Sequence, residues 1–245
     1  MKAIVLCGGF GTRLLPYTKD TPKHLLEVAH GKKVIDFVFE RIEQIDTIDE
    51  LFVITNNRYY DSFVNWAGMK GGIAITVVNG IEADNSKKVL EAIVNTIEME
   101  SISEDIVIVA GDTIYDFDFG ELNGCYEKLG QIVVCGMRLT DKTLLSNYGV
   151  ACIDRENVVT FFEEKPKDPK SAIAVLPLYY IPKKFIPLLT ACLRNSASDE
   201  LGGLVEYLYN KTKVYCHVVQ GITIDIGTAK RLEQARQYYK EGAVN

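Results

Sequence analysis

The sequence predicts an α/β fold, in which helices cover both faces of a mostly parallel sheet, and two observations carry this prediction. Short apolar runs alternate with segments of helical periodicity through the first 110 residues. These runs are apolar at successive positions, as in a strand that is buried on both faces. The second half holds more strands than the first, which predicts a smaller β-rich region there.

The first half supplies the regular part of this alternation. Apolar residues that recur every three or four positions predict helices at residues 34–45, 59–66 and 86–100. Continuous apolar and β-branched runs predict strands at residues 2–7, 51–55, 73–78 and 105–110. This order is typical of a Rossmann-like sheet, in which loops at the carboxyl ends of the strands bind ligands.

The second half predicts further strands and a closing helix. Strands are expected at residues 132–137, 149–153, 158–163, 174–181, 214–219 and 223–226. Helices are expected at residues 183–193, 201–211 and 229–240. Thr228 is the expected N-terminal cap of the last helix. Because no linker, repeat or low-complexity segment interrupts the chain, we expect a single domain over residues 1–245.

Composition argues against two broad classes of protein. The 245 residues carry 27 Lys and Arg against 33 Asp and Glu, a net charge of −6, whereas proteins that coat nucleic-acid duplexes are basic. No apolar run reaches the ~20 residues of a membrane helix, and the one near Met1 is too short for a secretory signal. The six cysteines include no Cys-x-x-Cys pair. We therefore expect a cytoplasmic protein with reduced thiols and with neither a nucleic-acid nor a membrane partner.

A glycine-rich loop follows the first predicted strand. Its glycines let backbone N–H groups approach an anion closely, because no Cβ intervenes. The loop lacks the Gly-Lys-Ser/Thr of a P-loop, and Pro16 and Pro22 replace the immediate helix of a dinucleotide-binding motif. It carries its own cations instead, Arg13 and Lys23, which suits a nucleoside triphosphate. The alternative is a tight turn with a solvated arginine.

Three glycines, two cations and two prolines stand at fixed spacing in this region. The motif reads Gly8-Gly9-x-Gly11-Thr12-Arg13-Leu14-x-Pro16-x-Thr18, then Pro22-Lys23-x-Leu25-Leu26. It resembles the sugar-phosphate nucleotidylyltransferases, the pyrophosphorylase family that makes nucleotide sugars, and within it the glucose-1-phosphate thymidylyltransferases. Later segments resemble the same family in the same order: Ala110-Gly111-Asp112, Tyr148-Gly149-Val150, Phe162-Glu163-Glu164-Lys165-Pro166 and Asp225-Ile226-Gly227-Thr228.

The resemblance implies transfer of a nucleoside monophosphate from a triphosphate, with dTTP or UTP favoured, to a sugar 1-phosphate. It implies that Arg13 neutralises the departing phosphates, that Lys23 lies between the two reacting phosphates, and that Asp112 and Asp225 hold Mg²⁺. Residues 1–130 would form the nucleotide-binding core and residues 131–245 the acceptor-binding and closing region. The nucleotide-binding positions carried over are Leu6, Cys7, Gly8, Gly9, Gly11, Thr12, Arg13, Asn79 and Gly111. The acceptor-binding positions are Tyr148, Gly149, Glu164, Lys165 and Val175. The family also suggests a homo-oligomer.

The chemistry of Asp112 and Asp225 also indicates a metal site. Each ends a predicted strand, and if both strands belong to one parallel sheet, their carboxylates meet at its carboxyl edge. Such a pair repels unless a cation joins it, and Mg²⁺ prefers carboxylate and phosphate oxygens. The local alternative makes Asp112 a turn former and Asp225 a helix-start carboxylate.

The expected acceptor pocket depends on a break in a strand. Glu164 and Lys165 are neighbours, so they reach one ligand only if the backbone kinks, which Pro166 favours. The alternative is a solvated charged loop. Gly149 is expected to offer its backbone to the sugar, because a larger residue would fill the space. Asp199, in the polar stretch 196–203, is a candidate lid residue.

Two departures from the family pattern leave the substrates open. Asn79 and the lysine-containing stretch after it replace the usual Gln and glycine turn that read the base. Pro177 replaces a glycine beside the sugar pocket and removes a backbone N–H. A CTP-dependent cytidylyltransferase acting on another phosphorylated small molecule therefore remains an alternative, and so does a non-catalytic regulatory subunit. The histidines are interpreted as structural or surface residues: His24, His30 and His217.

Overall fold

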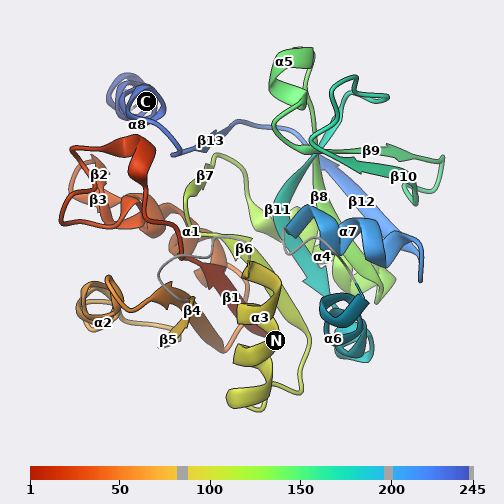
Figure 1. Ribbon diagram of the computed structural model, residues 1–245, viewed down its shortest axis with the longest axis horizontal. Helices are drawn as coiled ribbons and strands as arrows, with labels where there is room; N and C mark the ends of the chain where they lie inside the picture. Colours follow the sequence, from red (N-terminus) through yellow and green to blue (C-terminus); the bar gives the residue numbers. More distant parts are fainter. Residues whose placement is uncertain (82–87, 196–200, 243–245) are drawn as a thin grey trace.

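The computed structural model describes residues 1–81, 88–195 and 201–242 of the chain. Its main sheet has nine strands among these residues, and seven of them follow the order β10-β9-β11-β6-β1-β4-β5 (Figure 1). Four neighbouring strands run parallel: β1 (Lys2–Leu6), β4 (Glu50–Asn56), β5 (Ala74–Ile81) and β6 (Ile106–Ala110). The predicted mostly parallel sheet is therefore confirmed.

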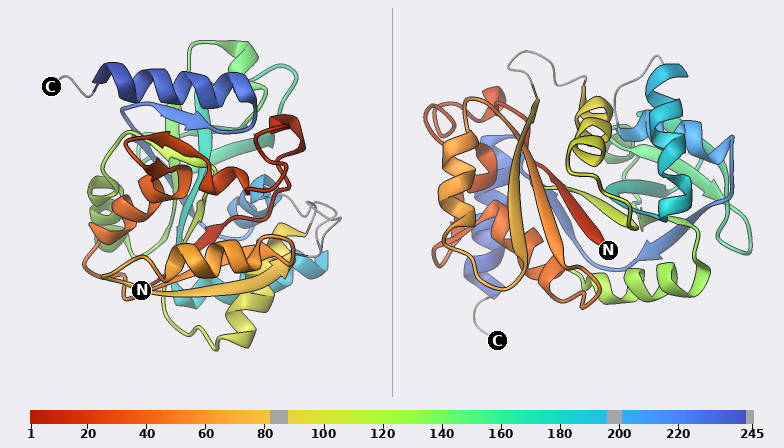
Figure 2. Two further views of the ribbon diagram at one scale, coloured as in Figure 1. Left: turned by 90° about the vertical axis from the view of Figure 1, so that its left-hand side faces the viewer. Right: turned by 90° about the horizontal axis from the view of Figure 1, so that it is seen from below.

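Helices cover both faces of this sheet (Figure 2). One face packs against α1 (Val34–Glu43), α2 (Tyr60–Ala67) and α4 (Phe119–Leu129). The other face packs against α3 (Val89–Met99), α6 (Ile186–Asn195) and α7 (Leu201–Tyr209). Neighbouring side chains on a strand enter opposite cores, as Ile4 and Val5 do. This double burial explains why the strands read as continuous apolar runs.

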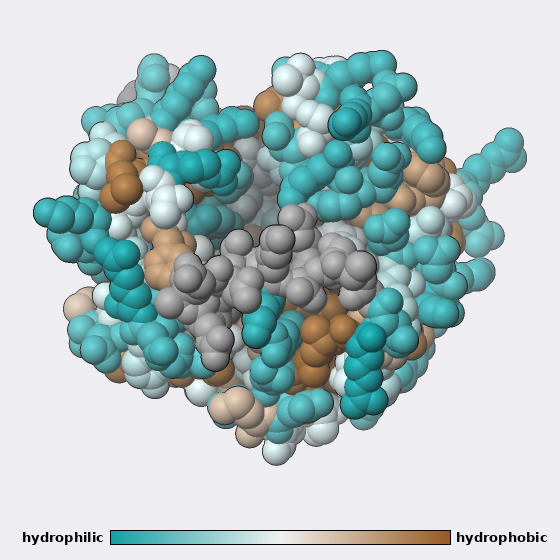
Figure 3. Space-filling model, viewed as in Figure 1, coloured by the Kyte–Doolittle hydropathy of each residue, from teal (hydrophilic) through white to brown (hydrophobic). Residues whose placement is uncertain are grey.

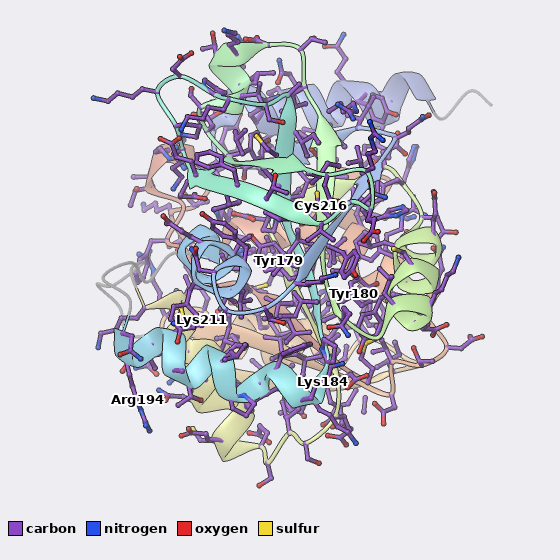
Figure 4. The ribbon with its side chains drawn as sticks, turned by 90° about the vertical axis from the view of Figure 1, so that its right-hand side faces the viewer. Tyr179, Tyr180, Lys184, Arg194, Lys211 and Cys216 are labelled. Carbon is purple, nitrogen blue, oxygen red and sulfur yellow. The ribbon has the colours of Figure 1, made fainter. Side chains whose placement is uncertain are left out.

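The second half extends the sheet with antiparallel strands. β11 (Ile173–Ile181) pairs antiparallel with β6, β9 (Gly149–Ile153) and β8 (Ile132–Arg138). β10 (Val159–Glu164) completes the predicted hairpin with β9, and β12 (Val214–Val219) runs parallel to β8. Tyr179 and Tyr180, neighbours on β11, pack into opposite cores (Figure 4).

Pro177 lies where the pairing of β11 changes. The register between β11 and β8 shifts between Leu176 and Tyr179, and the pairing of β11 with β6 begins at Leu178. A proline lacks the N–H that a regular ladder requires, so it fits best at such an irregularity. The carbonyl of Pro177 accepts a hydrogen bond from the Tyr115 hydroxyl at 3.3 Å.

Two small antiparallel sheets and a last helix complete the structure. β7 (Thr113–Tyr115) pairs with β13 (Thr223–Asp225), and β2 (Glu27–Ala29) pairs with β3 (Lys32–Lys33). α8 (Ala229–Gly242) follows β13, and the Thr228 hydroxyl caps it by accepting a hydrogen bond from the Arg231 N–H at 3.3 Å. The short helical turns are η1 (Thr12–Leu14), η2 (Lys23–Leu25), α5 (Lys142–Leu145) and η3 (Lys183–Phe185).

None of the helices in the described part of the chain is both long and apolar enough to cross a membrane.

Candidate active site

The glycine loop lies at the carboxyl ends of β1, β4 and β6, which adjoin in the sheet. Three hydrogen bonds fix its first residues: Gly111 N–H to the Leu6 carbonyl at 2.9 Å, Cys7 N–H to the Ile54 carbonyl at 2.8 Å, and Asn56 Nδ2 to the Gly8 carbonyl at 3.1 Å. In Figure 3 the molecule is hollowed between α8 and the β9–β10 hairpin. The predicted nucleotide-binding residues Leu6, Cys7, Gly8 and Gly111 thus meet at one edge of the sheet.

Close backbone approach explains two of the glycines. A Cβ on Gly111 would lie 2.5 Å from the Cys7 sulfur, and one on Gly11 would lie 2.8 Å from Thr18 Cγ2. Gly11 also has a φ of 63°, in the left-handed region that favours glycine. The Thr18 hydroxyl donates a hydrogen bond to the Gly11 carbonyl at 2.7 Å and holds the loop back on itself.

Lys23 crosses this loop and contacts Asp112. A Cβ on Gly9 would lie 3.4 Å from Lys23 Cε, and Lys23 Nζ forms an ion pair with Asp112 Oδ2. Burial lowers the pKa of Lys23, but the neighbouring Asp112 outweighs this effect and leaves that pKa raised. Burial likewise raises the pKa of Asp112, and the charge of Lys23 outweighs it and leaves the pKa lowered. Both groups are therefore charged at neutral pH.

Asp225 reaches the same place by a route that the sequence did not predict. The expectation of one shared parallel sheet is wrong, because β13 pairs antiparallel with β7 in a separate two-stranded sheet. That pairing sets Asp225 opposite Thr113, and the Ile226 N–H donates to the Asp112 carbonyl at 2.9 Å. The two aspartates therefore lie side by side.

The electrostatics of Asp225 follow from its neighbours. Burial, and next the charge of Asp112, raise the pKa of Asp225. A Cβ on Gly227 would lie 3.1 Å from Asp225 Oδ2 and 3.4 Å from Arg13 Nη2, so Arg13 also faces this group. The structure thus brings together the four side chains Arg13, Lys23, Asp112 and Asp225.

The donor set at this point suits a hard cation. No group of three or more His, Cys, Asp or Glu side chains in the described ranges could hold a metal ion, so the protein offers two carboxylates. Mg²⁺ is commonly bound by one or two carboxylates, with phosphate oxygens and water as its other ligands. A cation between Asp112 and Asp225 would relieve the repulsion that raises the Asp225 pKa.

His24 and Asn56 also belong to this region, and the sequence analysis did not place them there. Burial and the charge of Lys23 lower the pKa of His24 to about 3, so its imidazole is neutral. Asn56 accepts a hydrogen bond from the Tyr59 N–H at 3.3 Å while it holds Gly8. The position of His24 directly after Lys23 in the sequence could have indicated that it lies in this region. The structural interpretation of His30 and His217 stands as a prediction.

The proposed base-reading residue Asn79 lies at the end of β5, beside β4. It is exposed, and its Nδ2 contacts the side-chain oxygen of Asn57. Gly80 follows it, where a Cβ would lie 2.9 Å from Ile54 Cγ2. Most of the altered base loop, residues 82–87, lies outside the described residues, as does Asp199.

The predicted acceptor residues meet at the ends of β9 and β10. Gly149 pairs with Glu164 across the hairpin and with Val175 of β11. Lys165 has a φ of 47°, so the chain turns sharply after Glu164, as the sequence predicted. Lys165 Nζ lies 3.6 Å from Glu164 Oε1, and the Lys165 N–H donates to the Tyr148 carbonyl at 3.1 Å. Burial and the charge of Asp225 raise the pKa of Tyr148, which links this region to the aspartates.

The reason expected for Gly149 needs correction. A Cβ there would lie 2.3 Å from Phe162 Cζ and 2.7 Å from Glu164 Oε2. A Cβ on Gly202 in α7 would lie 1.7 Å from the same Glu164 oxygen. The space above Gly149 is therefore filled by the protein itself, and the Glu164 carboxylate lies between two glycines.

The fold and the four charged side chains define an α/β protein with a site of two basic and two acidic groups at the carboxyl edge of its sheet. The chain matches the Nucleotidyl transferase family over residues 2–242, and it belongs to that family. The resemblance seen in the motifs, to the sugar-phosphate nucleotidyltransferases, is confirmed.

Two curated relatives illustrate the similarity in sequence. The chain is 27% identical over 239 residues to a glucose-1-phosphate adenylyltransferase of Fervidobacterium nodosum, a match that covers 92% of this chain and 58% of the relative. It is 26% identical over 242 residues to the bifunctional protein GlmU of Methanocaldococcus jannaschii, a match that covers 97% of this chain and 54% of the relative. The chain thus spans just over half the length of these relatives.

Solved structures agree with the fold. A protein described as a glucose-1-phosphate thymidylyltransferase of Bacillus anthracis has a TM-score of 0.82 at 25% identity, over 98% of this chain and 96% of that chain. A UDP-glucose pyrophosphorylase crystallised with UDP-glucose has a TM-score of 0.83 at 18% identity, over 98% of both chains, and supports the fold alone.

Proposed function

We propose that this protein transfers a nucleoside monophosphate from UTP or dTTP to a sugar 1-phosphate and releases pyrophosphate. The observation that carries the proposal is the convergence of Arg13 and Lys23 with Asp112 and Asp225 at the carboxyl edge of the sheet. The names of the relatives supply the substrate class. The absence of a disulfide among its six cysteines, all within the described residues, supports a reducing compartment, the cytoplasm.

The reaction needs positioning and charge more than it needs a base. An oxygen of the acceptor phosphate attacks the α-phosphorus, and pyrophosphate leaves from the opposite side. Since a phosphate monoester is already anionic, no proton has to be removed first. The protein must hold two anions together and stabilise the charge that develops on the leaving group.

Each of the four side chains has a role in this scheme. Arg13 neutralises the β- and γ-phosphates as they leave. Lys23, charged beside Asp112, lies between the α-phosphate and the acceptor phosphate. Asp112 and Asp225 would hold Mg²⁺, which supplies screening of the repulsion between the reacting anions when it is bound. The glycine loop offers its backbone N–H groups to the triphosphate.

The acceptor would occupy the space beside the β9–β10 hairpin. Glu164 accepts hydrogen bonds from sugar hydroxyls, and Lys165 binds the acceptor phosphate. The sharp turn at Lys165 supports this assignment, because it brings the two neighbouring side chains within 3.6 Å of each other. Tyr148 and Val175 complete the acceptor side, and Asn79 contacts the base.

A second candidate is a cytidylyltransferase that acts on another phosphorylated small molecule. The observation in its favour is Asn79, which stands where the family usually has a longer Gln, and which is engaged with Asn57. Because the Asn79 side chain is shorter than Gln, its amide reaches less far toward the base, which alters the bases whose hydrogen-bonding groups it can contact.

The test is a matrix of triphosphates and acceptors with Mg²⁺, assayed by pyrophosphate release. Turnover of UTP or dTTP with a sugar 1-phosphate supports the first proposal. A strong preference for CTP supports the second. No release in any combination contradicts both and favours a regulatory nucleotide-binding subunit.

A further inference from the structure

The strand β5 is an open edge of the main sheet. In the described part of the chain it forms a ladder with β4 and ends the strand order. Figure 2 (left) shows β5 at the surface beside α2. Its eight residues, Ala74–Ile81, include no proline and no charged side chain. Soluble proteins usually protect such an edge with charge, proline, a bulge or a covering segment. The register of β5 against β4 shifts only near its end, between Asn79 and Ile81, so the edge from Ala74 to Asn79 is regular and open to a further strand.

Both sides of this edge are hollowed. A cavity of about 550 Å³ lies between α2 and β5, and its walls include Val64, Ile75 and Val77. Another of about 320 Å³ lies between α3 and β5, and its walls include Asn95 and Met99. The edge therefore has room for side chains on either side of an added strand.

Exposed apolar side chains gather at the same edge. Six large hydrophobic residues are well exposed in the described ranges, and three of them flank β5. Val64 is 43% exposed and Met69 76% exposed on the α2 side, and Met99 is 72% exposed on the α3 side. Met69 lies between Gly68 and Lys70, which both line the α2-side cavity. The exposed Met69 side chain and the α2-side cavity are thus neighbours on the surface.

We propose that β5 pairs antiparallel with β5 of a second copy of this chain, so that the two main sheets become continuous across a two-fold axis. The outward N–H and C=O groups of one strand would bond those of the other. A strand without charges can face its own copy without like-charge repulsion. The axis stands perpendicular to the sheet and keeps each face on its own side. The α2 helices of the two copies therefore lie on the same face of the joined sheet, and the exposed Val64 and Met69 belong to that face.

The size of the edge agrees with a stable dimer. Eight residues at ~3.4 Å each make an edge roughly 27 Å long. A sheet with a helix ~10 Å across on each face is roughly 30 Å thick, so this side of the molecule offers at most roughly 800 Å² per copy, comparable to the area that a specific interface buries on each partner. A two-fold contact of this kind is isologous and closes with two copies.

The first experiment measures the mass of the full chain by analytical ultracentrifugation from about 1 to about 100 µM, a range in which mass action reveals the dimer. We expect a dimer that dissociates on dilution. Val77→Lys, at the middle of β5, places two like charges next to each other across the axis, and Met69→Glu places a charge on the apolar α2 side of the interface. Each should raise the dimer dissociation constant at least about tenfold. Ile222→Glu is the matched control, since Ile222 is 45% exposed away from β5 and should leave the dimer intact.

A second measurement does not depend on any variant. Hydrogen exchange of residues 74–81 should slow as the concentration of the protein rises, because edge amides become bonded in the dimer. A wild-type monomer at every concentration, exchange of 74–81 that is independent of concentration, or a dimer that both charged variants leave intact would overturn the proposal.

Discussion

Lys23 and Asp112 form an ion pair that is mostly shielded from water, at the centre of the four proposed catalytic side chains. A charge contact made to a transition state in such a place is worth far more than one in bulk water. We predict that Lys23→Ala and Asp112→Asn each lower kcat roughly 10²- to 10³-fold. Steady-state pyrophosphate release measures this loss, and circular dichroism serves as the control for folding. Turnover within a factor of two of wild type in either variant would remove that residue from the mechanism.

The acid stability of the protein should depend on His24. Its folded pKa of about 3 lies below the ordinary value of 6.5. As the pH falls below 6.5, His24 becomes protonated in the unfolded chain but stays neutral in the folded protein. The free energy of unfolding therefore decreases with falling pH until the folded pKa is reached. Between pH 7 and pH 4 this loss amounts to about 3 kcal/mol.

The measurement is urea unfolding of wild type and His24→Asn at both pH values. The variant should lose about 3 kcal/mol less than wild type on acidification. His30→Asn is the control, because His30 is exposed and has a φ of 51° that asparagine tolerates. Equal acid losses in all three proteins would contradict the assignment to His24.

At the scale of elements, the β9–β10 hairpin and α7 hold the Glu164 carboxylate between two glycines. A methyl group at Gly149 would collide with Phe162 and Glu164. We predict that Gly149→Ala destabilises the fold by about 1–3 kcal/mol, the usual cost of overpacking. Gly124→Ala in α4 meets no atom within 4 Å and should stabilise the fold instead, by about 0.5–1 kcal/mol. Urea midpoints compare the two, and an unchanged midpoint for Gly149→Ala would contradict the packing described.

The turn at the end of β10 allows a separate test of the acceptor site. Lys165 has a positive φ, so Lys165→Gly should keep the turn and change stability by less than about 1 kcal/mol. Loss of a bond to a charged phosphate should raise the KM of the acceptor roughly 10- to 100-fold. Asn157→Gly, at a φ of 63° in the turn between β9 and β10, is the control and should leave this KM unchanged. A normal KM in Lys165→Gly would place the acceptor phosphate elsewhere.

Elements with strong patterns could be predicted from the sequence, and elements without them could not. β1, β4 and β6 are continuous apolar runs separated by segments of helical periodicity, so their existence and parallel direction could be predicted from the sequence pattern. β7 has three residues, which is too short for a periodicity. A strand was expected at residues 223–226, where β13 lies, but its pairing with β7 depends on contacts more than 100 positions apart. The proximity of Asp112 and Asp225 was therefore predicted for a reason that proved wrong. The packing role of Gly149 was also beyond prediction, because it depends on the conformations of Phe162 and Glu164.

At the scale of the whole molecule, ligands that bridge the two sides of the hollow should stabilise the fold. A triphosphate bound at 100 times its dissociation constant adds about 2.7 kcal/mol by mass action. We predict that UTP or dTTP with Mg²⁺ raises the melting temperature of wild type, and that the increase is smaller in Asp112→Asn. Differential scanning fluorimetry measures both, with inorganic sulfate at equal ionic strength as the control. An equal increase in the melting temperature of Asp112→Asn would show that Asp112 does not contribute to nucleotide binding.

The β7–β13 pair has one further consequence, for the long segment of the chain that lies between its two strands. The Asp116 N–H donates a hydrogen bond to the Ile222 carbonyl at 2.9 Å, so the chain leaves the proposed catalytic centre and returns to it at almost the same point. The segment between Asp116 and Ile222, which includes the hairpin proposed for the acceptor, therefore begins and ends at neighbouring points. A replacement of that segment that preserved the edge of β11 against β6 would leave the two aspartates undisturbed. Exchange of this segment would replace the proposed acceptor residues, Lys165 included, while Arg13, Lys23, Asp112 and Asp225 lie outside it and would keep their places.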